Sequence, residues 1–163
     1  MRNYWNERKG DFLKQLVSLT GLGWKQTRIP CYIVAAEQSW SSSDPLMIPL
    51  AAYTRMGADY FFFSLQHELI HILLLDNFED ENLSGENWVR DWLEQRYPAE
   101  SNLCGGHVLV HAIHACLHRG DIGQIQIAKH PEYRRSWEII EEEGAINIVE
   151  EFRAFALARN PVS

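Results

Sequence analysis

The 163-residue chain lacks paired cysteines, an excess of positive charge and a hydrophobic run long enough to cross a membrane. Its three cysteines, Cys31, Cys104 and Cys116, are widely spaced and form no CxxC pair. This spacing argues against a disulfide framework and a cysteine-based zinc site, and it predicts free thiols in a reducing compartment. The formal net charge of -7 would repel the phosphates of a nucleic acid, so we expect no nucleic-acid partner.

The most apolar stretch, residues 60–75, is shorter than the ~20 residues that a membrane-spanning helix needs. His67, Glu68 and His71 also lie in its middle, so a buried core helix explains the stretch better. The first residues contain no apolar segment of the kind found in signal peptides. We therefore expect no membrane partner and a cytoplasmic location.

The composition, 46% apolar with 23% charged residues, predicts one globular domain over residues 1–163. The pattern predicts an α+β fold, with a small N-terminal sheet followed by a mainly helical half. Pro49 argues against a central strand at that point, and Pro98 and the pair Gly105-Gly106 are expected to bracket a connection between helices. Residues 122–128 fit either a strand or a helical turn. The sheet is expected within residues 29–58, and helices are expected at about 3–20, 60–75, 86–97, 107–118, 131–143 and up to 159.

The sequence His67-Glu68-Leu69-Ile70-His71 is an HExxH motif. On a helix, positions i and i+4 lie on one face, so both imidazoles can reach one metal ion. Zinc suits this arrangement, with Zn–N distances of ~2.0–2.1 Å and an open position for water. Glu68 is placed to accept a proton from that water, which makes it the candidate general base.

The apolar helix that carries this motif after a small sheet resembles the zincin metallopeptidases. The resemblance extends over residues 61–75 and over the order of the elements. It implies a zinc-dependent peptidase in which His67 and His71 bind the metal and Glu68 acts as base. The residues after His71 lack the glycine and third histidine of the metzincin branch.

In the gluzincin branch of the zincins the third ligand is a glutamate on a downstream helix. The resemblance therefore points to Glu86, at the start of the helix expected at 86–97, in preference to Glu94. An acidic residue in a first helical turn is also favoured by the helix dipole alone. We nevertheless take Glu86 as the predicted third metal ligand.

Four of the seven histidines follow one helical face, at the spacing i, i+4, i+7 and i+11. A residue of this stripe could be the third ligand, or it could donate a hydrogen bond to the oxyanion of a tetrahedral intermediate. We predict the second role for His111 or His107, and a three-histidine metal site that includes His107, His111 or His114 is the alternative. The stripe consists of His107, His111, His114 and His118.

These features together predict a zinc-dependent hydrolase that cleaves a peptide or protein substrate with a metal-activated water. A non-catalytic module, in which four protein ligands surround a structural zinc, is the alternative. Iron or manganese in place of zinc is a further alternative, because the ligand set alone does not fix the metal.

Overall fold

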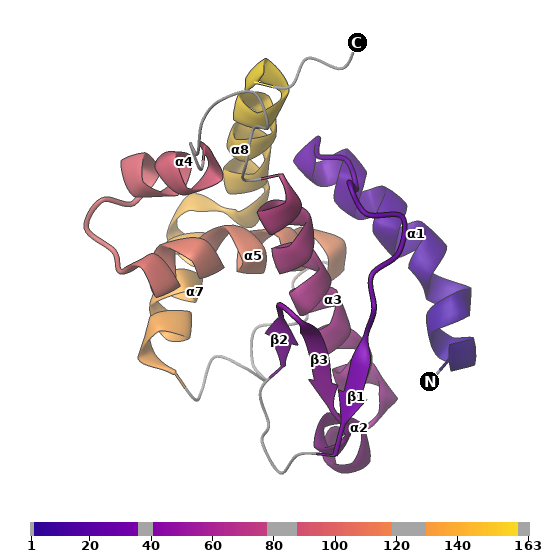
Figure 1. Cartoon of the computed structure of the whole chain (residues 1–163). Helices are drawn as coiled ribbons and strands as arrows, with labels where there is room; N and C mark the ends of the chain where they lie inside the picture. The colour runs from indigo at the N-terminus through magenta and orange to yellow at the C-terminus, as the bar shows by residue number, and fades with distance from the viewer. Residues whose placement is uncertain (1, 36–40, 78–87, 119–129, 160–163) are drawn as a thin grey trace.

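The computed structural model describes residues 2–35, 41–77, 88–118 and 130–159 (Figure 1). Most of these residues are helical, and the few strands lie in the N-terminal half, so the predicted α+β class is confirmed at this coarse level. In chain order the elements are α1 (Arg2–Thr20), β1 (Tyr32–Val34), β2 (Ser42–Ser43), β3 (Leu46–Pro49), α2 (Leu50–Met56), α3 (Ala58–Asp76), α4 (Trp88–Arg96), α5 (Asn102–His118), α7 (Pro131–Glu143) and α8 (Ala145–Arg159).

The sheet has three strands in the order β1-β3-β2. Strand β1 pairs in parallel with β3, and β2 pairs with it in antiparallel fashion. The expectation that Pro49 rules out a central strand is wrong, because Pro49 is the last residue of the central strand, opposite Val34. At a strand end, the missing N–H of proline removes little of the hydrogen bonding between the strands. The helix α2 that starts directly afterwards was not expected from the sequence.

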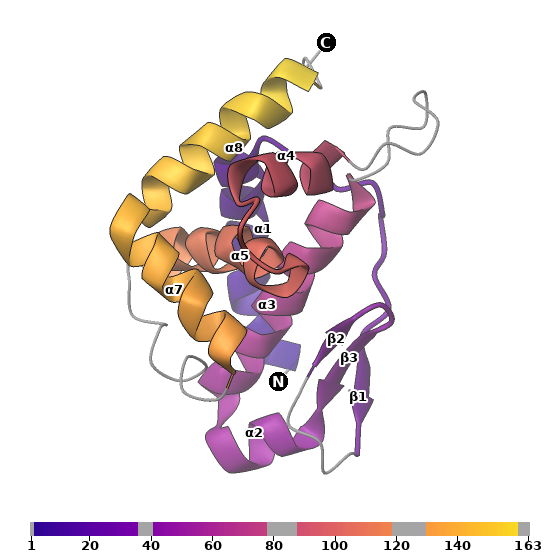
Figure 2. The same cartoon turned by 90° about the vertical axis from the view of Figure 1, so that its left-hand side faces the viewer.

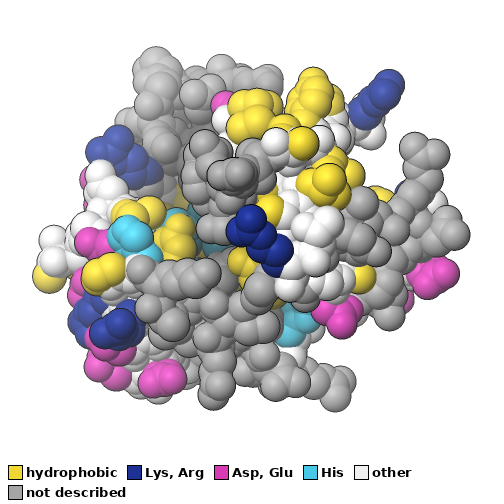
Figure 3. Space-filling model, turned by 90° about the horizontal axis from the view of Figure 1, so that it is seen from below, with side chains coloured by type: hydrophobic (Ala, Val, Ile, Leu, Met, Phe, Trp, Pro, Cys, Tyr) yellow, Lys and Arg dark blue, Asp and Glu magenta, His cyan; other side chains and the backbone are white. Residues whose placement is uncertain are grey.

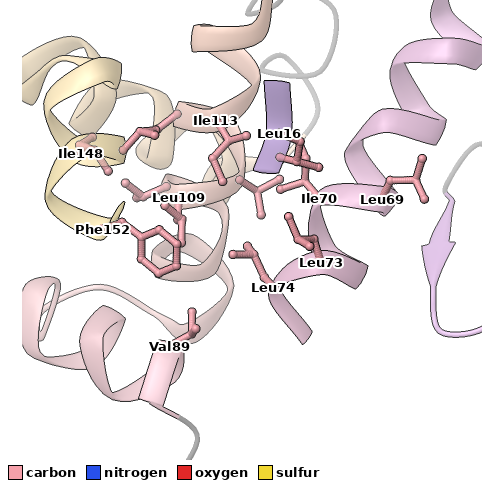
Figure 4. Packing of buried hydrophobic residues seen from close by; sticks show 14 of the residues in the cluster. Leu16, Leu69, Ile70, Leu73, Leu74, Val89, Leu109, Ile113, Ile148 and Phe152 are labelled. Carbon is pink, nitrogen blue, oxygen red and sulfur yellow. The ribbon is translucent and has the colours of Figure 1, made fainter. Parts of the chain in front are cut away.

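Helix α5 is the centre of the helical half. It contacts α1, α3, α4, α7 and α8, and α3 in turn lies between the sheet and α5 (Figures 1 and 2). The core is formed where these helices meet, with fully buried side chains such as Ile70 on α3, Ile113 on α5 and Phe152 on α8 (Figure 4). Because α3 and α5 are packed into this core, their polar side chains are held in fixed positions.

Helix α5 starts earlier than the sequence predicts. The backbone N–H of Cys104 donates to Ser101 Oγ at 3.1 Å, which makes Ser101 an N-terminal cap. The connection between α4 and α5 covers residues 97–101. The helix then runs through Gly105 and Gly106, so the expectation that the connection extends to this glycine pair is wrong. The cap and the packing of the helix outweigh the poor helix propensity of two glycines.

No described helix is both long enough and apolar enough to span a bilayer. The expected helix at 60–75 is confirmed as α3, with Gly57 in a left-handed conformation (φ 90°) just before it. Residues 122–128 lie outside the described residues.

Candidate metal centre

The two motif histidines face each other on α3. The Nε2 atoms of His67 and His71 are 3.2 Å apart, and the side chain of His67 is buried. Two nitrogens that share a tetrahedral zinc at ~2.0–2.1 Å are separated by about 3.3 Å, so this spacing fits one ion between them. A direct N–H···N hydrogen bond would satisfy the same distance in metal-free protein.

Helix α5 adds a third imidazole to this pair. One ring nitrogen each of His67, His71 and His107 lies within 4.8 Å of the others, and no other such group occurs among the described residues. The side chains of His67 and His107 are buried, while that of His71 is partly open to solvent. In the space-filling view from below, histidines accordingly cover only small areas of the described surface (Figure 3).

The orientation of His107 suits a metal ligand. Its Nδ1 lies 2.8 Å from the carbonyl oxygen of Leu103. Nδ1 must carry the proton to donate to a carbonyl, so Nε2 carries the free lone pair. Metal-binding histidines commonly make this second hydrogen bond. His67 departs from that pattern, since its Nδ1 is buried and has no hydrogen-bond partner among the described residues.

Burial keeps the three imidazoles neutral. The pKa of His71 is lowered to about 3, first by burial and then by the repulsion that a protonated His107 would exert. The pKa of His67 is lowered well below its usual value, mainly by burial and then by His71. Burial also lowers the pKa of His107. The neutral form is the one that binds a metal, so the cluster is ready for a cation at pH 7.

Glu68 directly follows His67 on α3 and is only 7% exposed. Burial raises the pKa of its carboxyl to about 7. A carboxyl with a pKa near the working pH suits proton transfer in both directions. The predicted base is therefore a buried carboxyl on the same helix as the two motif histidines.

Tyr133 of α7 is a site residue that the sequence analysis missed. Its ring lies over His107, with 4.4 Å between the ring centroids. Burial and the charge of Glu68 raise the pKa of its hydroxyl, which therefore stays protonated and able to donate. A tyrosine in the first turn of a helix opened by Pro131 carries no sequence signal for this role.

His111 is held by Ser136. Its Nδ1 lies 2.7 Å from Ser136 Oγ, and this hydroxyl donates its own proton to the carbonyl of Tyr133 at 2.8 Å. Nδ1 of His111 is therefore the donor, and the buried Nε2 keeps a lone pair without a partner among the described residues. With its pKa lowered to about 3 by burial, His111 is neutral, and this tautomer does not favour the predicted donation to an oxyanion.

His114 lies deeper, stacked on Phe63 with ring centroids 4.6 Å apart and on His67 at 5.4 Å. It is 0% exposed, and neither ring nitrogen has a hydrogen-bond partner among the described residues. A buried polar side chain without a partner costs about 1–3 kcal/mol. His114 is therefore a source of instability in the metal-free fold.

We expect His114→Leu to keep bound zinc and to raise the free energy of unfolding of the metal-free protein at pH 7 by about 1–3 kcal/mol. The pKa of His114 is lowered, mainly by burial, so only the unfolded chain binds this proton as the pH falls below 6.5. The wild type should therefore lose about 1.4 kcal/mol per pH unit more than the variant below that pH. Denaturant unfolding at pH 5 to 8 measures both effects. Loss of zinc in the variant would instead identify His114 as a ligand.

A cavity of about 600 Å³ opens next to the cluster. His71 and His107 form part of its wall, and the rest comes from the end of α3, from α4, from the connection at 97–101 and from the first two turns of α5. The cavity falls within the ~300–1,000 Å³ typical of ligand sites. A second cavity of about 770 Å³ lies between α1 and the sheet and has none of the clustered histidines in its wall.

Comparison with known proteins assigns the chain to no family. No protein family, curated protein or solved structure with which the chain was compared matches it. The site is therefore interpreted from its own geometry. That geometry brings His67, His71, His107 and His111 together, whereas the predicted ligand Glu86 lies outside the described residues.

Proposed function

We propose that this chain is a zinc-dependent hydrolase that cleaves peptide bonds. The observation that carries the proposal is the group of His67, His71 and His107, with the buried Glu68 directly after His67 on α3. Three neutral imidazoles match the three protein ligands of a catalytic zinc, and Glu68 matches the base. The zincin resemblance, a small sheet followed by a helix with HExxH, supports the same reaction class.

The donor set fits a zinc ion. His67, His71 and His107 would hold it, and the ion would supply a Lewis acid that acidifies a water molecule. Glu68 accepts the proton of that water at its carboxylate and passes it to the leaving amine. The hydroxyl of Tyr133 donates a hydrogen bond to the carbonyl oxygen as that oxygen gains negative charge.

The choice of His107 as third ligand differs from the choice of Glu86 made from the sequence. Its support is the position of His107 and the hydrogen bond from its Nδ1 to Leu103. In this proposal Tyr133 takes over the oxyanion role that was predicted for His111 or His107.

Metal content and hydrolysis together test the proposal. Protein purified without an affinity metal is expected to contain about one zinc per chain by elemental mass spectrometry. Cleavage of a peptide mixture should stop after chelation and return when zinc is added. A chain that binds no metal and takes up none on titration would rule the proposal out. Iron or manganese in the same spectrum, in place of zinc, would show that the site binds that metal instead.

A structural zinc is the second candidate function, and His111 is the observation that favours it. Its buried Nε2 lone pair is without a described partner, and its ring centroid lies 5.7 Å from that of His67. A small shift would make His111 a fourth protein ligand and leave no position for water. X-ray absorption of the zinc-loaded protein separates the two. Four histidine ligands indicate the structural module, and three protein ligands with an oxygen from water indicate the enzyme.

A further inference from the structure

Two adjacent glycines lie inside α5, directly before His107. Glycine is the poorest helix former after proline, because it loses the most backbone freedom. Close packing is the usual reason for such a residue, yet outside the adjacent residues and the helix's own backbone no described atom lies within 4 Å of a Cβ built on Gly105 or Gly106. Packing of the fold therefore does not require either glycine.

Both glycines form part of the wall of the cavity next to His71 and His107. A side chain at Gly106 would lie in that open space, so the absence of a side chain enlarges the cavity where it approaches the metal cluster. The two glycines thus weaken the helix and widen the cavity at the same point of the chain.

Much of the remaining wall is apolar, although the exposed polar residues Ser101 and Asn102 also form part of it. Leu75 and Leu103 are 43% and 42% exposed, and both line this cavity together with Leu93 and Tyr97. Exposed apolar surface gathered in a hollow indicates a binding site for an apolar group.

The charged side chains of the wall are already paired. Arg90 Nε lies 2.6 Å from Glu94 Oε1, and Glu100 Oε1 lies 2.9 Å from Arg135 Nη2. Each of these charges has an opposite charge beside it. The described wall is therefore better suited to an apolar ligand than to a charged one.

From these observations we infer that this cavity binds a large apolar side chain of the substrate, such as Leu, Phe or Met, next to the peptide bond that is cleaved. Gly105 and Gly106 provide the room for it, and Leu75, Leu93, Tyr97 and Leu103 contact it. This inference rests on the proposed function, because it places the substrate relative to His71 and His107.

The test uses zinc-loaded full-length protein and a synthetic peptide library in which the residues on both sides of the central bond vary. Mass spectrometry of the products gives the preference of the wild type, which should favour large apolar residues over Ala. In Gly106→Leu the new side chain narrows the cavity beside His107, and the ratio of cleavage beside Phe to cleavage beside Ala should fall about 10- to 200-fold. Gly106→Ala should give a smaller change in the same direction.

Gly10→Leu is the matched control. Gly10 also lies in a helix, α1, and also has no described atom within 4 Å of a built Cβ, but it borders the other cavity. The control should keep the preference of the wild type. Both leucine variants should unfold at a Tm about 2–4 °C higher, because leucine favours a helix more than the glycine that it replaces. Both variants should retain zinc.

The outcomes separate the two proposals. A wild type that cleaves peptides but prefers charged or small residues, or a Gly106→Leu variant with unchanged preference, would overturn the inference and leave the hydrolase proposal standing. A zinc-loaded wild type that cleaves no member of the library would refute the proposed function, and the inference would fall with it.

Discussion

Glu68→Gln is expected to leave zinc bound and to lower kcat for peptide hydrolysis by about 10²–10⁴-fold. Glutamine has nearly the same shape as glutamate but cannot accept the proton of the attacking water. Glu68 is buried and its pKa is raised to about 7 by burial, and a carboxyl with such a pKa can both take up and release a proton near pH 7. Zinc content by elemental mass spectrometry and the rate of cleavage, measured on one preparation, check both parts.

Tyr133→Phe is the comparison for this variant. It removes one hydrogen-bond donor and should cost about 10²–10³-fold in kcat, again with zinc retained. Turnover at the wild-type rate in Glu68→Gln would contradict the mechanism. Loss of zinc in Glu68→Gln would show that Glu68 is a ligand and that the base lies elsewhere.

His107→Ala is expected to weaken zinc binding by more than about 100-fold, as severely as His67→Ala. The reason is that each of these residues would supply one of three ligands, and removal of an outer hydrogen-bond partner alone costs about 10–100-fold. The affinity is measured by competition with a chelator of known affinity. Circular dichroism of each variant shows whether the helices persist.

Two further variants decide between the possible third ligands. His111→Ala should reduce the affinity by no more than about 100-fold, because His111 is held by Ser136 beside the site. Glu86→Gln should bind zinc as the wild type does. If Glu86→Gln loses zinc and His107→Ala keeps it, the third ligand is the glutamate to which the gluzincin resemblance points.

The helix that carries the motif could be predicted closely from the sequence. Its apolar residues are nearly continuous, and the motif itself fixes the relative position of His67 and His71, because the i, i+4 relation is a property of the helix alone. Local geometry of this kind needs no knowledge of the rest of the chain.

The start of α5 could not be predicted in the same way. The glycine pair at 105–106 has a strong local preference against a helix, and Ser101 is one of many serines that could serve as a cap. Contacts of α5 with five other helices decide the outcome, and these contacts are made by residues far apart in the sequence.

The position of His107 relative to His67 also depends on tertiary packing. The helical stripe predicts that His107, His111 and His114 share a face, but it does not say which of them approaches the motif. That choice depends on how far α5 is shifted along α3. Tyr133 depends in addition on the packing of α7 on α5.

The hydrogen bond to Leu103 orients His107, and α5, which carries it, contacts α3. This arrangement would make the stability of the fold depend on a bound metal. An ion shared by His71 and His107 would cross-link two core helices. It would also close the chain between these two residues into a loop. Metal binding and folding would then be one coupled equilibrium, in which free zinc sets the fraction of folded chain. Under zinc starvation the cell would lose the protein itself, through proteolysis of the unfolded form, and not only its activity.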